Sequence, residues 1–317
     1  GNPISGVTPV LSVTPMTGSS RAADRIVQPG PTDNLGTTVG QVFGTVAGPR
    51  LVEATVPVTG GDPLVLDNTF LFVAGPPVVE ESTITATGPV PADATTRSVV
   101  TIVLKDRFGN PVTGMSPRFD ALGSGNNFVQ PGATDSNGQA EGALMSTKAE
   151  TKVVWVSAPR GLETVLTTVQ FKAGNPSALW STISATDQIP ADGVTPSVVT
   201  ITIRDDYGNP IAGQSPTIVV SGEDNTVTQP TALTDENGVT TATITSRTPG
   251  TRSIGLTTPT SLASLRTSAT FKAGALASLV ITPQDPMIPA TGLMQFTAVG
   301  TDTFGNVVEV TPVWSVV

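Results

Sequence analysis

The sequence predicts an all-β protein made of tandem β-sandwiches that are arranged as an elongated rod. Three observations carry this prediction: short motifs return at a nearly fixed spacing, β-branched runs alternate with turns, and the linkers between repeats are short. The 317 residues suffice for two to four domains of about 100 residues each. The 32 glycines and 28 prolines fit many short strands joined by turns, whereas long helices tolerate few of either residue.

The clearest repeat is a motif of the form Asp-x-aromatic-Gly-Asn-Pro. It occupies residues 106–111 and 205–210, and a third copy at 302–307 has Val in place of Pro. The glycines of successive copies lie 99 and 97 positions apart. The opening tripeptide, Gly1-Asn2-Pro3, matches the end of a further copy.

Two other motifs keep the same spacing and the same order. Phe-Lys-Ala-Gly stands at 171–174 and 271–274, and a variant, Phe-Val-Ala-Gly, stands at 72–75. Thr-Asp-x-Asn-Gly stands at 134–138 and 234–238. Because several landmarks return together, the chain is a tandem repeat and not a chance resemblance.

The segments between these landmarks have the pattern of half-buried strands. Residues 98–104 read SVVTIVL and residues 197–203 read SVVTITI, with Val and Ile alternating with Thr in the second run. Turn signals separate such runs, and no long segment shows a helical apolar period. This pattern predicts a sandwich of about seven short strands in each repeat.

Each landmark is expected to shape a turn. In the first motif, Asp accepts hydrogen bonds from turn amides, Gly adopts positive φ, Pro ends the strand ladder, and the aromatic residue caps the core. In the Thr-Asp-x-Asn-Gly motif, Asn-Gly forms a tight turn before the next strand. The residues assigned to these turns are Asp106, Phe108, Gly109, Asn110, Pro111, Asp205, Tyr207, Gly208, Asn209, Pro210, Asp135, Asn137, Gly138, Asp235, Asn237 and Gly238.

The landmarks predict four repeats. Residues 1–75 are a domain that lacks its first strands, 76–174 and 175–274 are complete domains, and 275–317 are the first part of a further domain. The linkers Gly75-Pro76-Pro77 and Gly174-Asn175-Pro176 are short and contain proline, which favours a semi-rigid connection.

The composition excludes most enzyme chemistry. The chain has no Cys and no His, so it cannot form disulfides, Cys/His zinc sites, thiol nucleophiles or imidazole acid–base sites. Carboxylate pairs such as Asp205-Asp206 occupy adjacent strand positions that point to opposite faces. We therefore expect no enzyme activity, no catalytic residue and no cofactor.

Charge and hydropathy exclude two classes of partner. The net charge of −9 repels nucleic acid and anionic lipid. The longest apolar stretch, 64–74, is interrupted by Asp67 and Asn68 and is too short to span a bilayer. The chain opens without an initiating Met or a signal peptide, so we expect that it was processed or is a piece of something larger.

The recurring aspartates make calcium the one metal to consider. Asp106, Asp205 and Asp302 recur at the ends of repeats, but calcium takes about six or more oxygen ligands. Because one or two Asp per junction supply too few, turn capping is the favoured interpretation.

The aromatic side chains also permit two interpretations, a sugar-stacking set or packing in cores and junctions. The tendency of large aromatics to be buried favours packing. The residues concerned are Trp155, Trp180, Trp314, Phe43, Phe70, Phe119 and Phe128.

The motifs at 191–193, 198–213 and 234–238 resemble those of tandem bacterial immunoglobulin-like (Ig-like) domains of the intimin/invasin type, group 1. The resemblance covers residues 1–274. Residues 279–283, 295–301 and 313–315 resemble the group 2 bacterial Ig-like domain instead. The resemblance implies an extracellular location on a bacterial surface or appendage.

It also implies a structural stalk that spaces a distal adhesive tip from the cell, with neighbouring Ig-like domains as partners and host or environmental glycan or protein bound by parts outside this chain. Two alternatives stay open. The chain could be a filament subunit, assembled head to tail as identical chains complete each other's partial domains. It could also be a glycan- or protein-binding module of a phage or surface protein, acting through loops such as 123–127 and 222–225.

Overall fold

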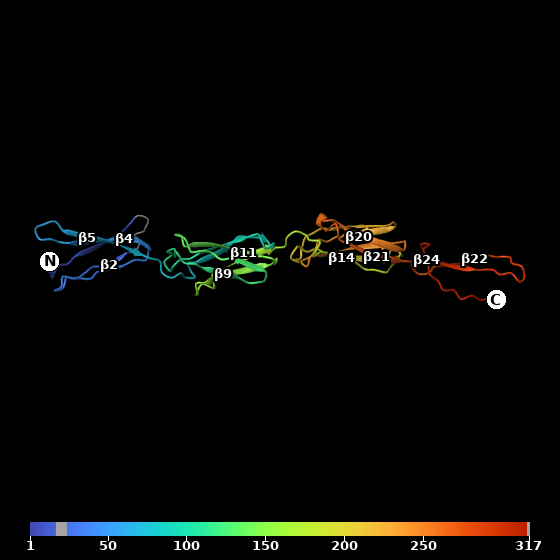
Figure 1. Cartoon of the computed structure of the whole chain (residues 1–317), viewed down its shortest axis with the longest axis horizontal. Coiled ribbons are helices and arrows are strands. Elements are labelled where there is room, and N and C mark those ends of the chain that lie inside the picture. The colour runs from blue at the N-terminus through green and yellow to red at the C-terminus, as the bar shows by residue number, and fades with distance from the viewer. Residues whose placement is uncertain (17–23, 316–317) are drawn as a thin grey trace. The chain divides into compact units, whose positions relative to one another are not determined.

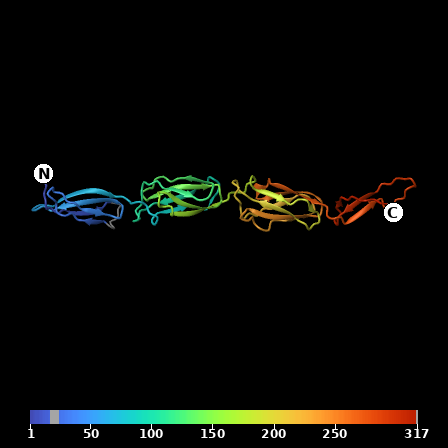
Figure 2. The same cartoon turned by 90° about the horizontal axis from the view of Figure 1, so that it is seen from below.

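The structure is a computed structural model that describes residues 1–16 and 24–315. The described residues are nearly all β, with a single 3₁₀ turn at Thr260–Leu262. The chain forms two compact units. One contains residues 1–90, 94–146 and 150–171, and the other contains 91–93, 147–149 and 172–317. The predicted all-β class and the tandem sandwiches are confirmed (Figures 1 and 2).

The second repeat contains two four-stranded sheets. Their orders are β10-β11-β8-β6 and β7-β13-β12-β9. The strands of the first sheet are β6 (Thr83–Ala86), β8 (Ser98–Val103), β10 (Asn126–Val129) and β11 (Gln139–Ser146). The strands of the second sheet are β7 (Val90–Pro91), β9 (Arg118–Ala121), β12 (Thr151–Ala158) and β13 (Leu166–Lys172).

The third repeat repeats this plan. Its sheets have the orders β14-β16-β19-β18 and β15-β21-β20-β17. The first sheet contains β14 (Thr182–Ala185), β16 (Ser197–Thr202), β18 (Asn225–Thr228) and β19 (Val239–Ser246). The second contains β15 (Ile189–Pro190), β17 (Thr217–Val220), β20 (Gly250–Thr258) and β21 (Arg266–Lys272). Strand β15 runs parallel to β21, with Ile189 opposite Phe271, and the other described pairings of this repeat are antiparallel.

The core of the third repeat follows from the alternation in the sequence. Val199, Ile201 and Ile203 are completely buried, and they share one core cluster with Ile244 of the adjacent strand β19 and Phe271 of the opposite sheet. The intervening threonines are less buried. Each buried side chain of this size contributes about 1.5–3 kcal/mol of transfer free energy, so the alternation accounts for the placement of the sheet.

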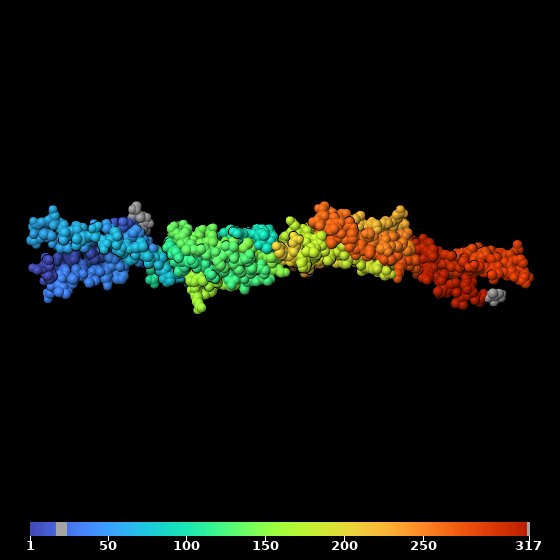
Figure 3. Space-filling view, in the orientation of Figure 1, coloured from blue at the N-terminus to red at the C-terminus, as the bar shows by residue number. Residues whose placement is uncertain are grey.

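The described residues of the first and fourth repeats form fewer strands. Residues 1–75 form the sheet β1-β4-β5 and the pair β2-β3. These strands are β1 (Val10–Pro15), β2 (Arg25–Val27), β3 (Gln41–Phe43), β4 (Gly48–Val56) and β5 (Leu64–Phe72). The last repeat has β22 (Ser278–Thr282), β23 (Thr297–Thr301) and β24 (Val307–Val308), and β22 is exposed along its whole length (red in Figure 3).

The expectation of aromatic packing is confirmed for Phe119, whereas Trp155 is partly buried and lies outside the core. Phe119 is 1% exposed and lies edge-on to Phe128. On β12, by contrast, Val154 and Val156 face the core, which places Trp155 on the other, partly exposed face. Trp180 is 49% exposed and lies beside Gly208 of its own repeat.

Trp314 and Phe43 are also about half exposed, whereas Phe70 is partly buried and contacts Phe72. Within residues 1–16 and 24–315, the structure has no helix long and apolar enough to cross a bilayer.

Candidate functional site

The Asp-x-aromatic-Gly-Asn motif folds into a turn that its own aspartate closes. One carboxylate oxygen of Asp106, Oδ1, accepts hydrogen bonds from the amides of Phe108 (2.9 Å) and Asn110 (3.0 Å). Gly109 has φ +78°, a value that side chains disfavour. The same pair of amide bonds occurs at Asp205, from Tyr207 and Asn209, and at Asp302, from Phe304 and Asn306.

The second oxygen of the same carboxylate binds the linker that enters the repeat. Oδ2 of Asp106 accepts the amide of Gly75 at 2.9 Å, and it also accepts Nδ2 of Asn110 at 2.8 Å. The two later copies make these bonds with equal or nearly equal lengths, to Gly174 and Asn209 at Asp205 and to Gly274 and Asn306 at Asp302. The final glycine of Phe-x-Ala-Gly is therefore held by the following repeat.

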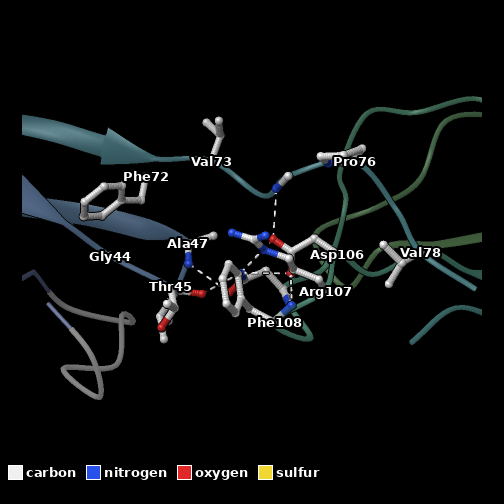
Figure 4. A pocket seen from close by; sticks show the side chains of 13 residues that line it. Gly44, Thr45, Ala47, Phe72, Val73, Pro76, Val78, Asp106, Arg107 and Phe108 are labelled. Carbon is white, nitrogen blue, oxygen red and sulfur yellow. Dashed lines mark hydrogen bonds between the residues drawn. The ribbon is translucent and has the colours of Figure 1, made fainter. Parts of the chain in front are cut away.

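The asparagine of the motif reaches back to the preceding repeat. Asn110 donates from Nδ2 to the carbonyl of Thr45 (2.8 Å), and its Oδ1 accepts the amide of Ala47 (2.9 Å; Figure 4). Asn209 does the same with the carbonyl of Thr147 (2.9 Å) and the amide of Ala149 (3.1 Å). One side-chain amide thus pairs with a carbonyl and an N–H of the same backbone segment.

We call the aspartate and asparagine of each motif the clamp, and the backbone segments 45–47, 147–149 and 247–249 the receptor loops. The third clamp donates from Asn306 to the carbonyl of Arg247 at 2.8 Å. Position 249 is proline, which has no N–H to return the second bond. The sequence of the receptor loop therefore decides how many bonds a clamp forms.

The first two clamps are buried polar groups whose aspartate and asparagine are both hydrogen-bonded. Asp106, Asp205 and Asn209 are 2%, 1% and 3% exposed. Hydrogen bonds that involve a charged group contribute about 1.5–3 kcal/mol each, and an unsatisfied buried partner costs a similar amount. Loss of one hydrogen-bonding partner at a junction should therefore weaken the remaining hydrogen bonds of that clamp.

A cleft of about 320 Å³ lies beside the first clamp. Figure 4 shows Phe72, Val73, Pro76, Val78 and Phe108 around it. Its lining is mainly apolar, and the carboxylate and amide of the clamp within it are already hydrogen-bonded. These two groups are therefore already engaged and are not available to orient a substrate.

The expectation that the aromatic residue of the motif caps the core is wrong. Phe108, Tyr207 and Phe304 are 49%, 41% and 46% exposed. The hydroxyl of Tyr207 donates to the carbonyl of Asp93 at 3.1 Å, and the guanidinium of Arg247 lies 5.6 Å from the ring centre of Phe304. Both contacts are with the preceding repeat, so these rings belong to junctions.

The Thr-Asp-x-Asn-Gly motif makes a turn within its repeat. Oδ1 of Asp135 accepts the amides of Asn137 (2.8 Å) and Gln139 (2.9 Å), and Gly138 has φ +74°. Asp235, Asn237 and Gly238 form the same turn in the third repeat. Pro111 and Pro210 pair with Lys105 and Arg204 in isolated bridges just after the clamp.

The candidate calcium ligands are occupied by N–H donors. Both oxygens of Asp106, Asp205 and Asp302 accept hydrogen bonds from amides. In the part of the chain that the structure describes, no three acidic side chains converge as a metal site. This geometry favours turn and linker binding over cation coordination, and the absence of calcium stays a prediction.

The model of the bacterial Ig-like domain (group 1) matches residues 81–172 and 181–272, more than half of the chain. The chain belongs to this family. One relative, the inverse autotransporter adhesin YeeJ of Escherichia coli (strain K12), is 30% identical over 169 residues. That alignment takes in 52% of this chain and 7% of YeeJ.

Two solved structures share the Ig-like fold. The crystal structure of invasin, a bacterial integrin-binding protein, has a TM-score of 0.59 and 24% identity over 90% of this chain and 57% of its own. The adhesin FdeC of Escherichia coli has a TM-score of 0.55 and 23% identity over 86% and 88%. At these identities the similarity is evidence for a shared fold and not for a shared function. The group 2 resemblance of the last segment stays a prediction.

The junction role of the Ig-like motif was missed in the sequence. The receptor loops contribute backbone groups, and their residues are only partly shared, because 45–47 and 147–149 read Thr-x-Ala whereas 247–249 reads Arg-Thr-Pro. A signal did exist in the spacing. The motif and the Phe-x-Ala-Gly exit recur in phase, which fits two motifs that meet in space.

The clamp of the last Ig-like junction should open only in acid. Burial raises the pKa of Asp302, but hydrogen bonds from Asn306 and from the amides of Gly274 and Phe304 outweigh burial and lower it from 3.8 to about 2. Because the folded pKa is depressed, the stabilisation is complete above pH about 4 and is lost as pH falls towards 2.

The amide proton shift of Gly274 should therefore titrate with a midpoint of about 2, well below the ordinary aspartate value of 3.8. A midpoint near the ordinary value would contradict the clamp. The pKa of Asp106 is lowered in the same way, since bonds from Asn110 and Gly75 outweigh burial, so Gly75 serves as a second probe.

Proposed function

We propose that the chain is a non-catalytic spacer segment of a bacterial surface adhesin, holding an adhesive part at a distance from the cell. The observation that carries this proposal is the clamp, which recurs with one design at three junctions. The family supports it, because YeeJ and FdeC are adhesins. The extracellular surface location is part of the same proposal.

A spacer has to keep its direction from one domain to the next. A flexible linker loses reach because its ends separate only as the square root of its length. Each clamp ties the linker glycine and the preceding receptor loop to one buried carboxylate–amide pair. The ordering cost of about 1–2 kcal/mol per linker residue is offset by several hydrogen bonds, which supports a semi-rigid spacer.

The chemistry of the junctions also supports a role without catalysis. The carboxylate and amide of the clamp beside the cleft are already paired, and the chain has neither His nor Cys to serve as a nucleophile or general base at neutral pH. The aromatic rings at the second and third junctions contact the preceding repeat. These features fit surfaces that hold domains to each other.

Small-angle X-ray scattering of the 317-residue chain tests the proposal. We expect a long particle for the unmodified chain and a shorter, broader distance distribution when Asn110→Ala and Asn209→Ala are combined. The matched control is the pair Asn137→Ala and Asn237→Ala, which removes exposed turn asparagines within repeats. The control should leave the particle length unchanged.

Other outcomes would redirect the proposal. A compact particle for the unmodified chain would contradict the spacer role. Growth of the particle with concentration would favour a filament subunit, and binding of the isolated chain to a glycan array or to host cells would favour a binding module.

A further inference from the structure

A basic side chain is buried at the same place in three repeats. Arg50, Lys152 and Arg252 are spaced by 102 and 100 positions and are 0%, 0% and 6% exposed. Each follows its receptor loop by only a few residues on the chain. A buried cation is costly unless hydrogen bonds or charges compensate it, so its partners show what the position does.

Arg252 is compensated mainly by neutral oxygen atoms of the segment that leads into the junction. Its Nη2 donates to the carbonyl (2.9 Å) and the hydroxyl (2.7 Å) of Thr248 and to the hydroxyl of Ser246 (3.1 Å). Its Nε donates to Oδ1 of Asn225 at 2.8 Å. The guanidinium fork thus holds the carbonyl of Thr248 towards the interior of the domain.

Arg50 makes the corresponding bond in the first repeat. Its Nη2 donates to the carbonyl of Val46 at 3.0 Å, and Asp24 supplies a countercharge 2.6 Å from Nε. Val46 stands four residues before Arg50, as Thr248 stands four residues before Arg252. Two independent repeats therefore point the same carbonyl at a buried arginine.

The neighbouring carbonyl is the one that the clamp uses. Thr45 and Arg247 directly precede the arginine-bound residues, and their carbonyls accept hydrogen bonds from Asn110 and Asn306. Residues 45–46 and 247–248 each form a bend between two strands. An arginine that binds the second carbonyl of this bend also restricts the preceding carbonyl, which the clamp of the next repeat meets.

We infer that the buried arginine is a positioning residue for the junction, which shapes the receptor loop so that the following repeat can clamp it. This inference concerns the contact itself and does not depend on the spacer role. The same guanidinium lies over the ring of the Phe-x-Ala-Gly motif, 5.6 Å from the centre of Phe72 for Arg50 and 6.0 Å from that of Phe271 for Arg252. It therefore touches the strand that leads into the clamped linker as well as the receptor loop.

The second repeat carries a natural variation of this device. The ammonium of Lys152 donates to the carbonyl of Ser124 (2.6 Å) and pairs with Glu150, the residue that follows its receptor loop. A lysine presents a point charge and lacks the planar fork of arginine. This position shows that a lysine can be buried here and makes Arg252→Lys a conservative test variant.

Spin labels on both sides of the third junction measure directly how Arg252 affects the geometry of that junction. Because the chain has no cysteine, Ser268→Cys and Ser278→Cys place two labels on exposed positions of β21 and β22. Double electron–electron resonance on the full chain then reports the width of the distance distribution. The reference for a broken clamp is Asn306→Ala, and the control is Arg266→Met, which removes an exposed arginine of the same domain.

We expect Arg252→Met to widen the distribution as much as Asn306→Ala does, and the double variant to widen it no further. Arg266→Met should leave the width unchanged. A folded Arg252→Met chain with the original width would overturn the inference, as would a double variant in which the two effects add.

Arg252→Lys keeps the test decisive if Arg252→Met does not fold. One ammonium cannot reach Asn225, Ser246 and Thr248 in the manner of the fork, so we expect a partial widening in a chain whose melting temperature is nearly unchanged. An unchanged width in this folded variant would overturn the positioning role.

Discussion

Replacing Gly238 by alanine is expected to destabilise the third repeat by about 3 kcal/mol or more. Gly238 has φ +77°, and an added Cβ would lie 2.3 Å from the carbonyl oxygen of Ile203 and 3.1 Å from the nitrogen of Ile211. Both contacts are backbone atoms that cannot rotate away. Relief requires that the bond from the Ile203 amide to the Gly238 carbonyl, now 2.8 Å, be stretched.

Gly213→Ala is the matched control. Gly213 has nearly the same backbone conformation, φ +78°, but no atom lies within 4 Å of an added Cβ. This variant should lose only about 1–2 kcal/mol, the cost of the left-handed conformation for a residue with a side chain. The difference between the two variants isolates the steric contribution of the turn from its conformational contribution.

Denaturant unfolding with a local probe measures both variants. Combining Trp155→Phe with Trp314→Phe leaves Trp180 as the single tryptophan, and Trp180 lies in the third repeat. The midpoint for Gly238→Ala should fall well below that for Gly213→Ala. Equal midpoints would show that the close backbone approach at Gly238 does not control stability.

Asn110→Asp should open the first junction at neutral pH and reclose it in mild acid. The substitution keeps the shape of the side chain but removes the donors to Thr45 and to Asp106. It also places a second carboxylate at the 2.8 Å distance that Nδ2 of Asn110 now keeps from Asp106. Two like charges at such a distance cannot both stay ionised, so the pair takes up a proton with a raised apparent pKa.

The sign of the pH effect distinguishes this variant from the unmodified chain. The unmodified clamp relies on an ionised Asp106 whose pKa is lowered. The width of the distance distribution across its junction should therefore be constant from pH 7 to 5. In the variant, the shared proton supplies a donor again, and the distance distribution across the junction should narrow between about pH 6 and 4. Labels at Asn68→Cys and Thr83→Cys, both exposed, report the width of the distance distribution across this junction.

Asn137→Asp is the control for charge alone. Asn137 also lies beside an aspartate, with Nδ2 3.4 Å from Asp135, but that turn is exposed and lies within one repeat. This control should leave the label distances unchanged at every pH. A pH-independent width in Asn110→Asp would contradict the assignment of Asn110 to the junction.

The strands were predictable where burial leaves a period in the sequence. The alternation in 197–203 identified Val199, Ile201 and Ile203 as one face, and these three are completely buried. The turn chemistry of Asp-x-aromatic-Gly-Asn was predictable for a similar reason, because the hydrogen bonds that Asp106 accepts from nearby amides are local along the chain.

It was harder to predict which face of a strand is buried where a charged residue shares that face with apolar ones. On β12, Lys152 shares the inner face with Val154 and Val156, and a lysine ordinarily indicates the solvent side. The junction bonds could not be predicted because the partners of the asparagine are backbone groups about 60 residues away. A repeat shows that a motif is reused, but not which surface it faces.

The parallel pairing of β15 with β21 has a consequence for mechanical load. The first of these strands lies near the start of the third repeat and the second near its end, and the amide of Ala191 adds a bond to Lys272 at the same place. A pull applied through the two ends of the domain slides parallel strands along each other. Their hydrogen bonds then resist together, in shear, and do not open one after another as in an unzipping hairpin.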